Sequence, residues 1–186
     1  MILSYAGFTI LTDPNFLHRG DHVHLGHGMT AARRTDPPLE LEALPPIDFV
    51  LLSHMHEDHF DREVERKLDR SLPSVTTPHA AADLSFKGFR AAKALNTWEP
   101  LTVTKDSAWV RVRALPGAHA PGVVAKMLLA AMGSLIEFEN SRGEVAFRAY
   151  ITGDTVFFDE LKEISRRLPD IDLALLHLGA RCFSAC

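Results

Sequence analysis

Histidines and carboxylates crowd into one short segment of the chain, His54-Met55-His56-Glu57-Asp58-His59. This segment directly follows a continuous apolar run, residues 47–52, which is typical of a strand buried on both faces. On an extended chain, residues i and i+2 point the same way, so His54 and His56 can bind one metal ion. Imidazole and carboxylate ligands suit zinc, and also manganese or iron, better than copper(I) or calcium. The segment therefore predicts a divalent metal site, with zinc as the expected metal.

Further ligand-type residues stand where the chain can bring them to the same place. Asp61 is a favourable N-cap for a helix running to about Arg70, and the turn into that helix can carry Asp58 and His59 toward a second metal position. Two later segments each contribute one more candidate ligand. His119 ends the segment Leu115-Pro116-Gly117-Ala118-His119, and Asp154 lies in the segment Ile151-Thr152-Gly153-Asp154-Thr155.

Together, these motifs in this order resemble the metallo-β-lactamase superfamily, whose signature is H-x-H-x-D-H after an apolar strand. Thr12-Asp13-Pro14 and Gly133-Ser134-Leu135-Ile136-Glu137 are similar to segments of the branch that contains ascorbate-phosphate lactonases and N-acyl-phosphatidylethanolamine phospholipase D. The resemblance covers nearly the whole chain, residues 2–179. It implies an α/β fold, the four-layer αββα sandwich, with residues 1–186 as a single domain.

The resemblance also implies a role for each residue of the motifs. His54, His56 and His119 would hold one metal ion, Asp58 and His59 would hold a second, and Asp154 would bridge the two. A hydroxide held between the metals would be the nucleophile, and Asp58 would help to orient it. Gly153 fits this picture, because the absence of a side chain allows the tight turn that carries Asp154 inward.

The family has one more histidine, on a later strand, which completes the second metal position. Residues 171–179 resemble the penultimate strand of the family, but residues 181–186 depart from it, and the first strand expected before Ile2 is missing. We therefore expect a domain incomplete at both ends, with an incomplete second metal position and a tendency to self-associate. His177 is a candidate substitute ligand, but a residue at the rim of the site is the favoured interpretation.

The remaining histidines and the cysteines have simpler explanations. Residues 15–46 are expected to form a long loop, and its histidines are expected to be solvated rather than to line a pocket: His18, His22, His24 and His27. His79 follows Pro78 and is expected at a helix start. Cys182 and Cys186 form a weak C-x-x-x-C signal near the chain end, and so few cysteines favour a reducing cytoplasm.

Several elements should surround the site. Residues 2–5 and 8–12 predict one hairpin, and residues 134–139 and 145–152 predict another. Residues 108–114 alternate as a strand does, and a final buried strand is expected over residues 171–176. Apolar residues near helical spacing predict one more helix: Phe158, Leu161, Ile164 and Leu168. Strands mixed with helices are typical of a layered α/β fold.

Composition narrows the function. The 186 residues are 46% hydrophobic and 24% charged, which is ordinary for a globular protein, and the formal net charge of −4 gives no basic surface for nucleic acid. The amino terminus has no positive leader, and the longest other apolar stretch, residues 123–132, is interrupted by Lys126 and is too short to span a bilayer.

The favoured function is a metal-dependent hydrolase of a small ester, lactone or phosphoester. One alternative is a catalytically impaired metal-binding remnant, and another is a nuclease of the same superfamily, which the lack of basic surface disfavours. The oxygen-reducing di-iron relatives place a glutamate where this chain has His56, which favours a hydrolase over an oxidoreductase. Substrate choice is expected to depend on the loops at residues 15–46 and 120–133.

Overall fold

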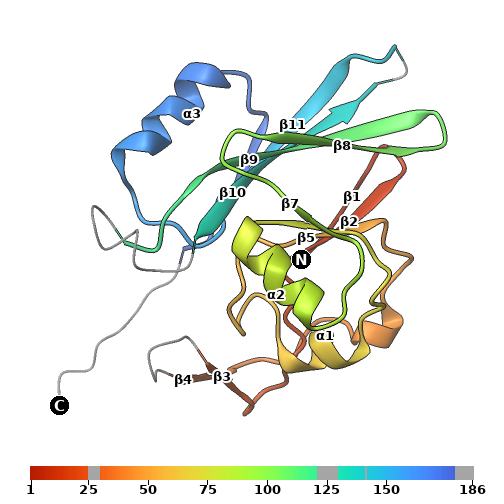
Figure 1. Ribbon diagram of the computed structural model, residues 1–186, viewed down its shortest axis with the longest axis vertical. Coiled ribbons are helices and arrows are strands. Elements are labelled where there is room, and N and C mark those ends of the chain that lie inside the picture. The colour runs from red at the N-terminus through yellow and green to blue at the C-terminus, as the bar shows by residue number, and fades with distance from the viewer. Residues whose placement is uncertain (25–29, 121–129, 141, 179–186) are drawn as a thin grey trace.

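Two five-stranded sheets form the centre of the computed structural model, which describes residues 1–24, 30–120, 130–140 and 142–178 (Figure 1). The first sheet consists of β1 (Ile2–Tyr5), β2 (Phe8–Thr12), β5 (Phe49–Leu51), β6 (Ser74–Thr76) and β7 (Ala92–Ala94), in that order. The second consists of β12 (Leu173–Leu175), β11 (Val145–Ile151), β10 (Ala131–Glu139), β9 (Ala108–Gly117) and β8 (Pro100–Lys105), in that order. A separate ribbon pairs β3 (His22–His24) with β4 (Thr30–Ala32).

The strand pairing confirms both predicted hairpins. β1 and β2 are antiparallel, with Tyr5 opposite Phe8, and β10 and β11 are antiparallel, with Ser134 opposite Ile151. β2, β5, β6 and β7 run parallel to one another, so their carboxyl ends meet at one edge of the first sheet. The predicted metal-binding segment begins at that edge, three residues after β5 ends.

Three apolar clusters define four layers. The cluster between the sheets includes Phe8, Phe49 and Val112, and all three side chains are buried. A second cluster packs the outer face of the first sheet against α1 (Arg62–Lys67) and α2 (Pro78–Phe86). A third packs the outer face of the second sheet against α3 (Lys162–Arg167), and Figure 1 shows α3 on the opposite side of the molecule from α1 and α2. The predicted αββα sandwich is confirmed.

The long segment predicted as a loop, residues 15–46, contains more structure than expected. It carries the β3–β4 ribbon and a short 3-10 helix, Leu41–Ala43. Strands of three residues are too short to show a sequence period, which explains why the ribbon escapes prediction. A 3-10 turn at Asp159–Leu161 leads into α3, so the helix predicted from the apolar spacing is present.

Two predicted elements differ from the structure. The helix capped by Asp61 ends at Lys67 rather than near Arg70, because the chain turns extended at Leu68, whose side chain packs on the outer core of the first sheet. The final strand is shorter than expected and is not buried. β12 is the outermost described strand of its sheet, and Leu173 is 40% exposed because no described layer covers it.

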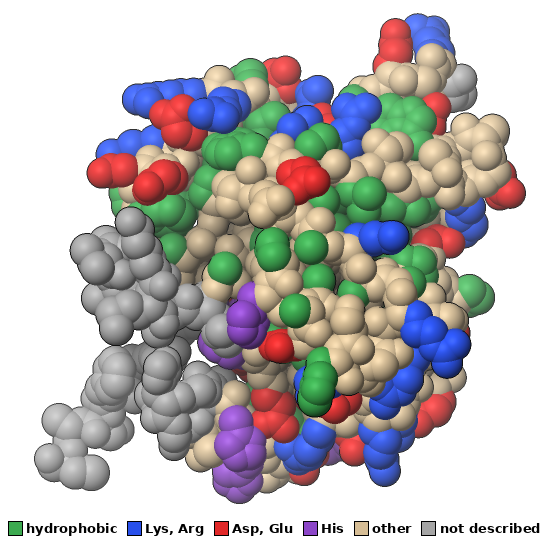
Figure 2. Space-filling view, viewed as in Figure 1, with side chains coloured by type: hydrophobic (Ala, Val, Ile, Leu, Met, Phe, Trp, Pro, Cys, Tyr) green, Lys and Arg blue, Asp and Glu red, His purple; other side chains and the backbone are tan. Residues whose placement is uncertain are grey.

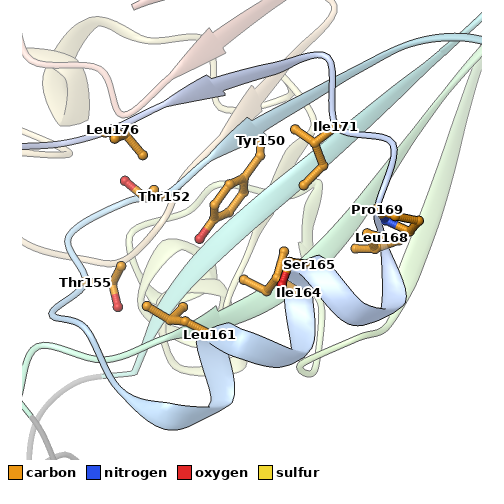
Figure 3. A pocket seen from close by; sticks show the side chains of 10 residues that line it. All are labelled: Tyr150, Thr152, Thr155, Leu161, Ile164, Ser165, Leu168, Pro169, Ile171 and Leu176. Atoms are coloured by element: carbon orange, nitrogen blue, oxygen red, sulfur yellow. The ribbon is translucent and has the colours of Figure 1, made fainter.

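An apolar cleft of about 380 Å³ remains between α3 and the second sheet (Figure 3). Tyr150 points into it from β11, and Leu161 and Ile164 face it from the opposite wall. Thr152 and Thr155 form one end of the cleft, on either side of the Gly153-Asp154 turn.

No helix among the described residues is long and apolar enough to cross a membrane.

Candidate metal centre

The predicted ligands lie beyond the ends of three strands. Ser53 and His54 follow β5, Asp154 follows β11, and His119 follows β9. Backbone hydrogen bonds join the strand ends across the two sheets: Met132 N donates to Ser53 O at 3.0 Å. The sandwich therefore brings together residues that are about one hundred positions apart in the sequence.

Three histidines form the first of two groups of candidate ligands. Nitrogen atoms of His54, His56 and His119 all lie within 4.8 Å of one another, and the rings of His54 and His119 are 4.5 Å apart. His54 Nε2 is 2.9 Å from His56 Nδ1. Zinc–nitrogen bonds of about 2.0–2.1 Å separate two ligand atoms of a tetrahedral site by about 3.3 Å, so the spacing suits a shared ion.

A second group shares His54 and adds His59 and Asp154, whose ligand atoms also lie within 4.8 Å of one another. His59 Nε2 is 3.3 Å from Asp154 Oδ2 and 3.7 Å from Asp58 Oδ2. Among the described residues, Asp58 belongs to neither group, although it borders the second. The structure thus places all six predicted residues in one region and leaves Asp58 at its margin.

The site has the polar chemistry that a cation requires. Asp58 Oδ1 is buried and accepts no hydrogen bond from the described part of the chain, which is costly for a carboxylate oxygen unless a cation or donor satisfies it. Neutral imidazoles supply nitrogen ligands and carboxylates supply oxygen ligands, and zinc, manganese and iron bind both. On these grounds the residues fit a divalent metal ion.

Burial and mutual contact shift the pKa values of these groups strongly. Burial, together with the neighbouring His59 and His119, lowers the pKa of His54 to about 2. Burial likewise lowers the pKa of His56. Both side chains are therefore neutral imidazoles at pH 7, which is the form that binds metal.

His59 and Asp154 form an ion pair, which favours the charged form of both side chains. Burial acts to lower the pKa of His59, but hydrogen bonds to Asp13 and Asp154 outweigh it and raise the pKa to about 10. The hydrogen bond from His59 lowers the pKa of Asp154 to about 2. Without a metal ion, His59 is therefore an imidazolium at neutral pH.

The turn that carries Asp154 requires glycine. Gly153 has a φ of +60°, and a Cβ there would lie 2.9 Å from both Met132 O and Ser53 Cβ. Thr155, on the other side of Asp154, accepts a hydrogen bond from Ala118 N at 3.0 Å. This bond ties the Asp154 turn to the segment that carries His119.

Asp61 anchors the metal-binding segment from its other end. Its side chain is fully buried, and Oδ1 caps α1 by accepting from Glu63 N and Val64 N, as the sequence predicts. Its Oδ2 also accepts from Phe16 N and from Leu17 N, a contact that the sequence does not reveal. One carboxylate therefore fixes the start of α1 against the segment that follows β2.

The sequence also misses the partners of the histidines. Asp13 Oδ1 accepts hydrogen bonds from Ser53 N at 2.8 Å and from Ser53 Oγ at 2.9 Å, and it lies 3.4 Å from His59 Nδ1. The only sequence signals for these roles were the Thr12-Asp13-Pro14 motif and a serine directly before His54. Neither indicates a contact across forty residues.

The other histidines that the structure describes belong to neither group. His177 is exposed at the rim, as predicted, and its ring centre is 6.0 Å from that of His59. His79 is exposed in the first turn of α2, as predicted. The loop histidines that the structure describes, His18, His22 and His24, are exposed, and two of them pair with glutamates. His27, Cys182 and Cys186 lie outside the described residues.

Figure 2 shows histidine side chains at two places on one face of the molecule, each beside acidic side chains. Among the exposed histidines, His24 Nδ1 lies 2.5 Å from Glu57 Oε2. Arg62 also donates to Glu57 and to His22 O, so the β3–β4 ribbon is attached to the segment that carries the predicted ligands.

A model of the β-lactamase superfamily domain matches residues 9–182. The chain belongs to this superfamily. It is similar to an N-acyl-phosphatidylethanolamine-hydrolyzing phospholipase D of Caenorhabditis elegans, with 26% identity over 97% of this chain and 51% of the relative. It is also similar to a metal-dependent hydrolase of Natranaerobius thermophilus, with 28% identity over 71% of this chain and 53% of the relative. This chain thus spans about half the length of these curated relatives.

Solved structures confirm the fold. An isothiocyanate hydrolase from Delia radicum gut bacteria superposes with a TM-score of 0.71 at 21% identity, over 90% of this chain and 64% of that one. A possible metal-dependent hydrolase from Veillonella parvula superposes with a TM-score of 0.72 at 21% identity, over 93% and 66% of the two chains.

Proposed function

We propose that this superfamily member is a metal-dependent hydrolase of a small ester, lactone or phosphoester, with zinc as its metal. The observation that carries the proposal is the convergence of His54, His56 and His119 into one group of mutually close nitrogen atoms. The names of the two curated relatives describe hydrolases, which supports the reaction class. We further place the reaction in a reducing cytoplasm, because only two cysteines occur in the chain.

Each residue has a defined part in this proposal. His54, His56 and His119 would hold the first metal ion, Asp58 and His59 would contribute to a second, and Asp154 would be shared by both positions. A bound divalent ion lowers the pKa of water to about 7 and stabilises negative charge on the scissile carbonyl or phosphoryl oxygen. Asp58 orients the attacking water, because its buried Oδ1 lies at the margin of the site with no competing described donor.

A nuclease activity remains the weaker candidate within the superfamily. On the face shown in Figure 2, basic and acidic side chains are interspersed. The formal net charge is −4, whereas binding to a nucleic acid backbone rests on clustered Lys and Arg.

A substrate panel tests the proposal. The purified chain is stripped of metal, supplied with zinc, manganese or iron(II), and assayed on a lactone, a phosphodiester and a thioester. We expect turnover of at least one class, reduced more than about 100-fold in His56→Ala and Asp154→Ala, since losing a ligand should exceed the 10- to 100-fold effects of outer partners. His79→Ala is the control and should keep full activity, because its side chain is exposed on α2.

Turnover that survives in both ligand variants would contradict a metal-dependent reaction. Metal binding without turnover of any class would favour the remnant over the hydrolase.

A further inference from the structure

The hydroxyl of Ser53 contacts three polar side chains of the candidate metal centre. Ser53 Oγ lies 2.9 Å from Asp13 Oδ1, 2.9 Å from His54 Nδ1 and 3.3 Å from His59 Nδ1. The Ser53 side chain is buried, so water does not compete for these contacts. Ser53 has no part in the ligand set proposed above, and its contacts therefore need a separate explanation.

The number of protons on the hydroxyl decides the direction of each bond. A serine hydroxyl has one hydrogen to donate and two lone pairs that accept. The Asp13 carboxylate can only accept, and it already accepts from Ser53 N at 2.8 Å. The Ser53 hydrogen therefore goes to Asp13, and both lone pairs are left for N–H groups. The two nitrogens within reach are Nδ1 of His54 and Nδ1 of His59, and the hydrogen on His59 Nδ1 also faces Asp13 Oδ1 at 3.4 Å.

This arrangement orients both rings. When Nδ1 carries the hydrogen that faces Ser53, Nε2 of the same ring is the atom left to bind a metal ion. His54 Nε2 faces His56 Nδ1 at 2.9 Å, within the first group. His59 Nε2 faces Asp154 Oδ2 at 3.3 Å, within the second group.

We propose that Ser53, held by Asp13, is a positioning residue that fixes the tautomer and ring orientation of one histidine in each metal position. The inference rests on the proposed function, because it assigns Nε2 of His54 and His59 as the metal-binding atoms. A single hydroxyl thus couples the two positions.

The backbone holds Ser53 firmly in place. Asp13 adopts a φ of +40°, which is unfavourable for a residue with a side chain and persists only where its surroundings compensate. On the other side, a Cβ at position 153 would lie 2.9 Å from Ser53 Cβ, so Gly153 packs directly against the serine. Ser53 therefore has little freedom to turn its hydroxyl elsewhere.

Ser53→Ala tests the role with two measurements. Zinc affinity is measured by competition with a chelator, and we expect it to fall about 10- to 100-fold, as is typical for loss of an outer hydrogen-bond partner. Ser74→Ala is the matched control: Ser74 is also buried in the first sheet, but within the described part of the chain its hydroxyl donates only to Leu72 O. The zinc affinity of the Ser74→Ala variant should stay within about threefold of that of the wild type.

The second measurement reports the tautomer itself. Long-range ¹H–¹⁵N correlation spectra of the metal-free protein at neutral pH distinguish the two nitrogens of His54. We expect hydrogen on Nδ1 in the wild type and in Ser74→Ala, and a mixture of both tautomers in Ser53→Ala. Asp13→Asn provides a second variant, in which the hydroxyl loses its charged acceptor, and it should also weaken zinc binding.

Two results would overturn the inference: hydrogen on Nε2 of His54 in the wild type, or wild-type zinc affinity and tautomer in Ser53→Ala. A wild-type chain that binds no metal but shows hydrogen on Nδ1 would refute the proposed function and support the hydrogen-bond assignment. The two failures are therefore distinguishable.

Discussion

His59 must change its charge when it binds a metal ion. Its pKa of about 10 makes it an imidazolium at neutral pH, because hydrogen bonds to Asp13 and Asp154 outweigh the effect of burial. A metal ligand is the neutral imidazole, so a proton and the metal compete for Nε2. His54 and His56, whose pKa values burial lowers, have no such proton to lose at pH 7.

We therefore predict that filling the position that contains His59 releases close to one proton. The raised pKa means that the bound proton opposes metal binding until the pH passes about 10. Between pH 7 and that value, the apparent affinity of this position should rise about tenfold per pH unit. Calorimetric titration with zinc in two buffers of different ionisation enthalpy gives the number of protons.

His59→Gln is the comparison variant, and it should bind its first zinc ion without releasing a proton. Binding of a second ion to the wild type with no proton release would show that His59 is not a ligand.

The residues of the candidate site were predictable to different degrees. Histidines and carboxylates of the kind that bind metal stand out in sequence because their types and spacing are unusual, and the structure brings His54, His56 and His119 together. Ser53 and Asp13 were not predictable in the same way. A serine and an aspartate are common polar residues, and only the fold shows that their side chains meet.

At the scale of elements, α1 and the segment after β2 depend on one carboxylate. Asp61 accepts four backbone hydrogen bonds, two from the first turn of α1 and two from Phe16 and Leu17. The same residue lies two positions after His59, so it also fixes where the metal-binding segment ends.

We predict that Asp61→Ala lowers the free energy of unfolding by about 2–4 kcal/mol. Loss of an N-cap costs about 1 kcal/mol, and buried N–H groups left without an acceptor cost about 1–3 kcal/mol more. Urea unfolding measures the change. Asp69→Ala should cost less than about 1 kcal/mol, because Asp69 is exposed and accepts only from Ser71. Equal losses in the two variants would show that the contacts to Phe16 and Leu17 contribute nothing.

The elements with a strong local pattern were predictable, and the others were not. Continuous apolar runs and turn residues predicted both hairpins and the buried strand β5. β6 and β7 have only three residues each, too few to show a period. β12 was expected to be buried, because an apolar run does not show whether another layer covers it, and Leu173 is exposed.

At the scale of the whole molecule, the two sheets meet at the candidate site, and the β12 edge of the second sheet, which leads to His177 at the rim of that site, presents apolar side chains. Leu176 is 58% exposed and Leu178 is 86% exposed, next to the edge strand β12. Exposed apolar side chains beside a strand edge with which no described strand pairs favour contact with another chain.

We predict that the protein self-associates through this edge at micromolar concentrations. Sedimentation velocity should show a dimer or larger species for the wild type and a smaller one for the double variant Leu176→Glu, Leu178→Glu. Phe86→Glu is the control: Phe86 is 95% exposed, but it lies on α2 in the opposite outer layer, and its replacement should not change the association. A wild-type chain that sediments as a monomer throughout this range would contradict the prediction.

The metal content of the purified protein tests the central claim most directly. After exhaustive dialysis, elemental analysis should find nearer one zinc ion per chain than two, because His54, His56 and His119 supply three imidazoles to one position, whereas a proton on His59 opposes metal binding at the other. His56→Ala should lose this ion, and His79→Ala should retain it. A wild-type chain that retains no divalent metal, or a His56→Ala chain that retains as much as the wild type, would contradict the account.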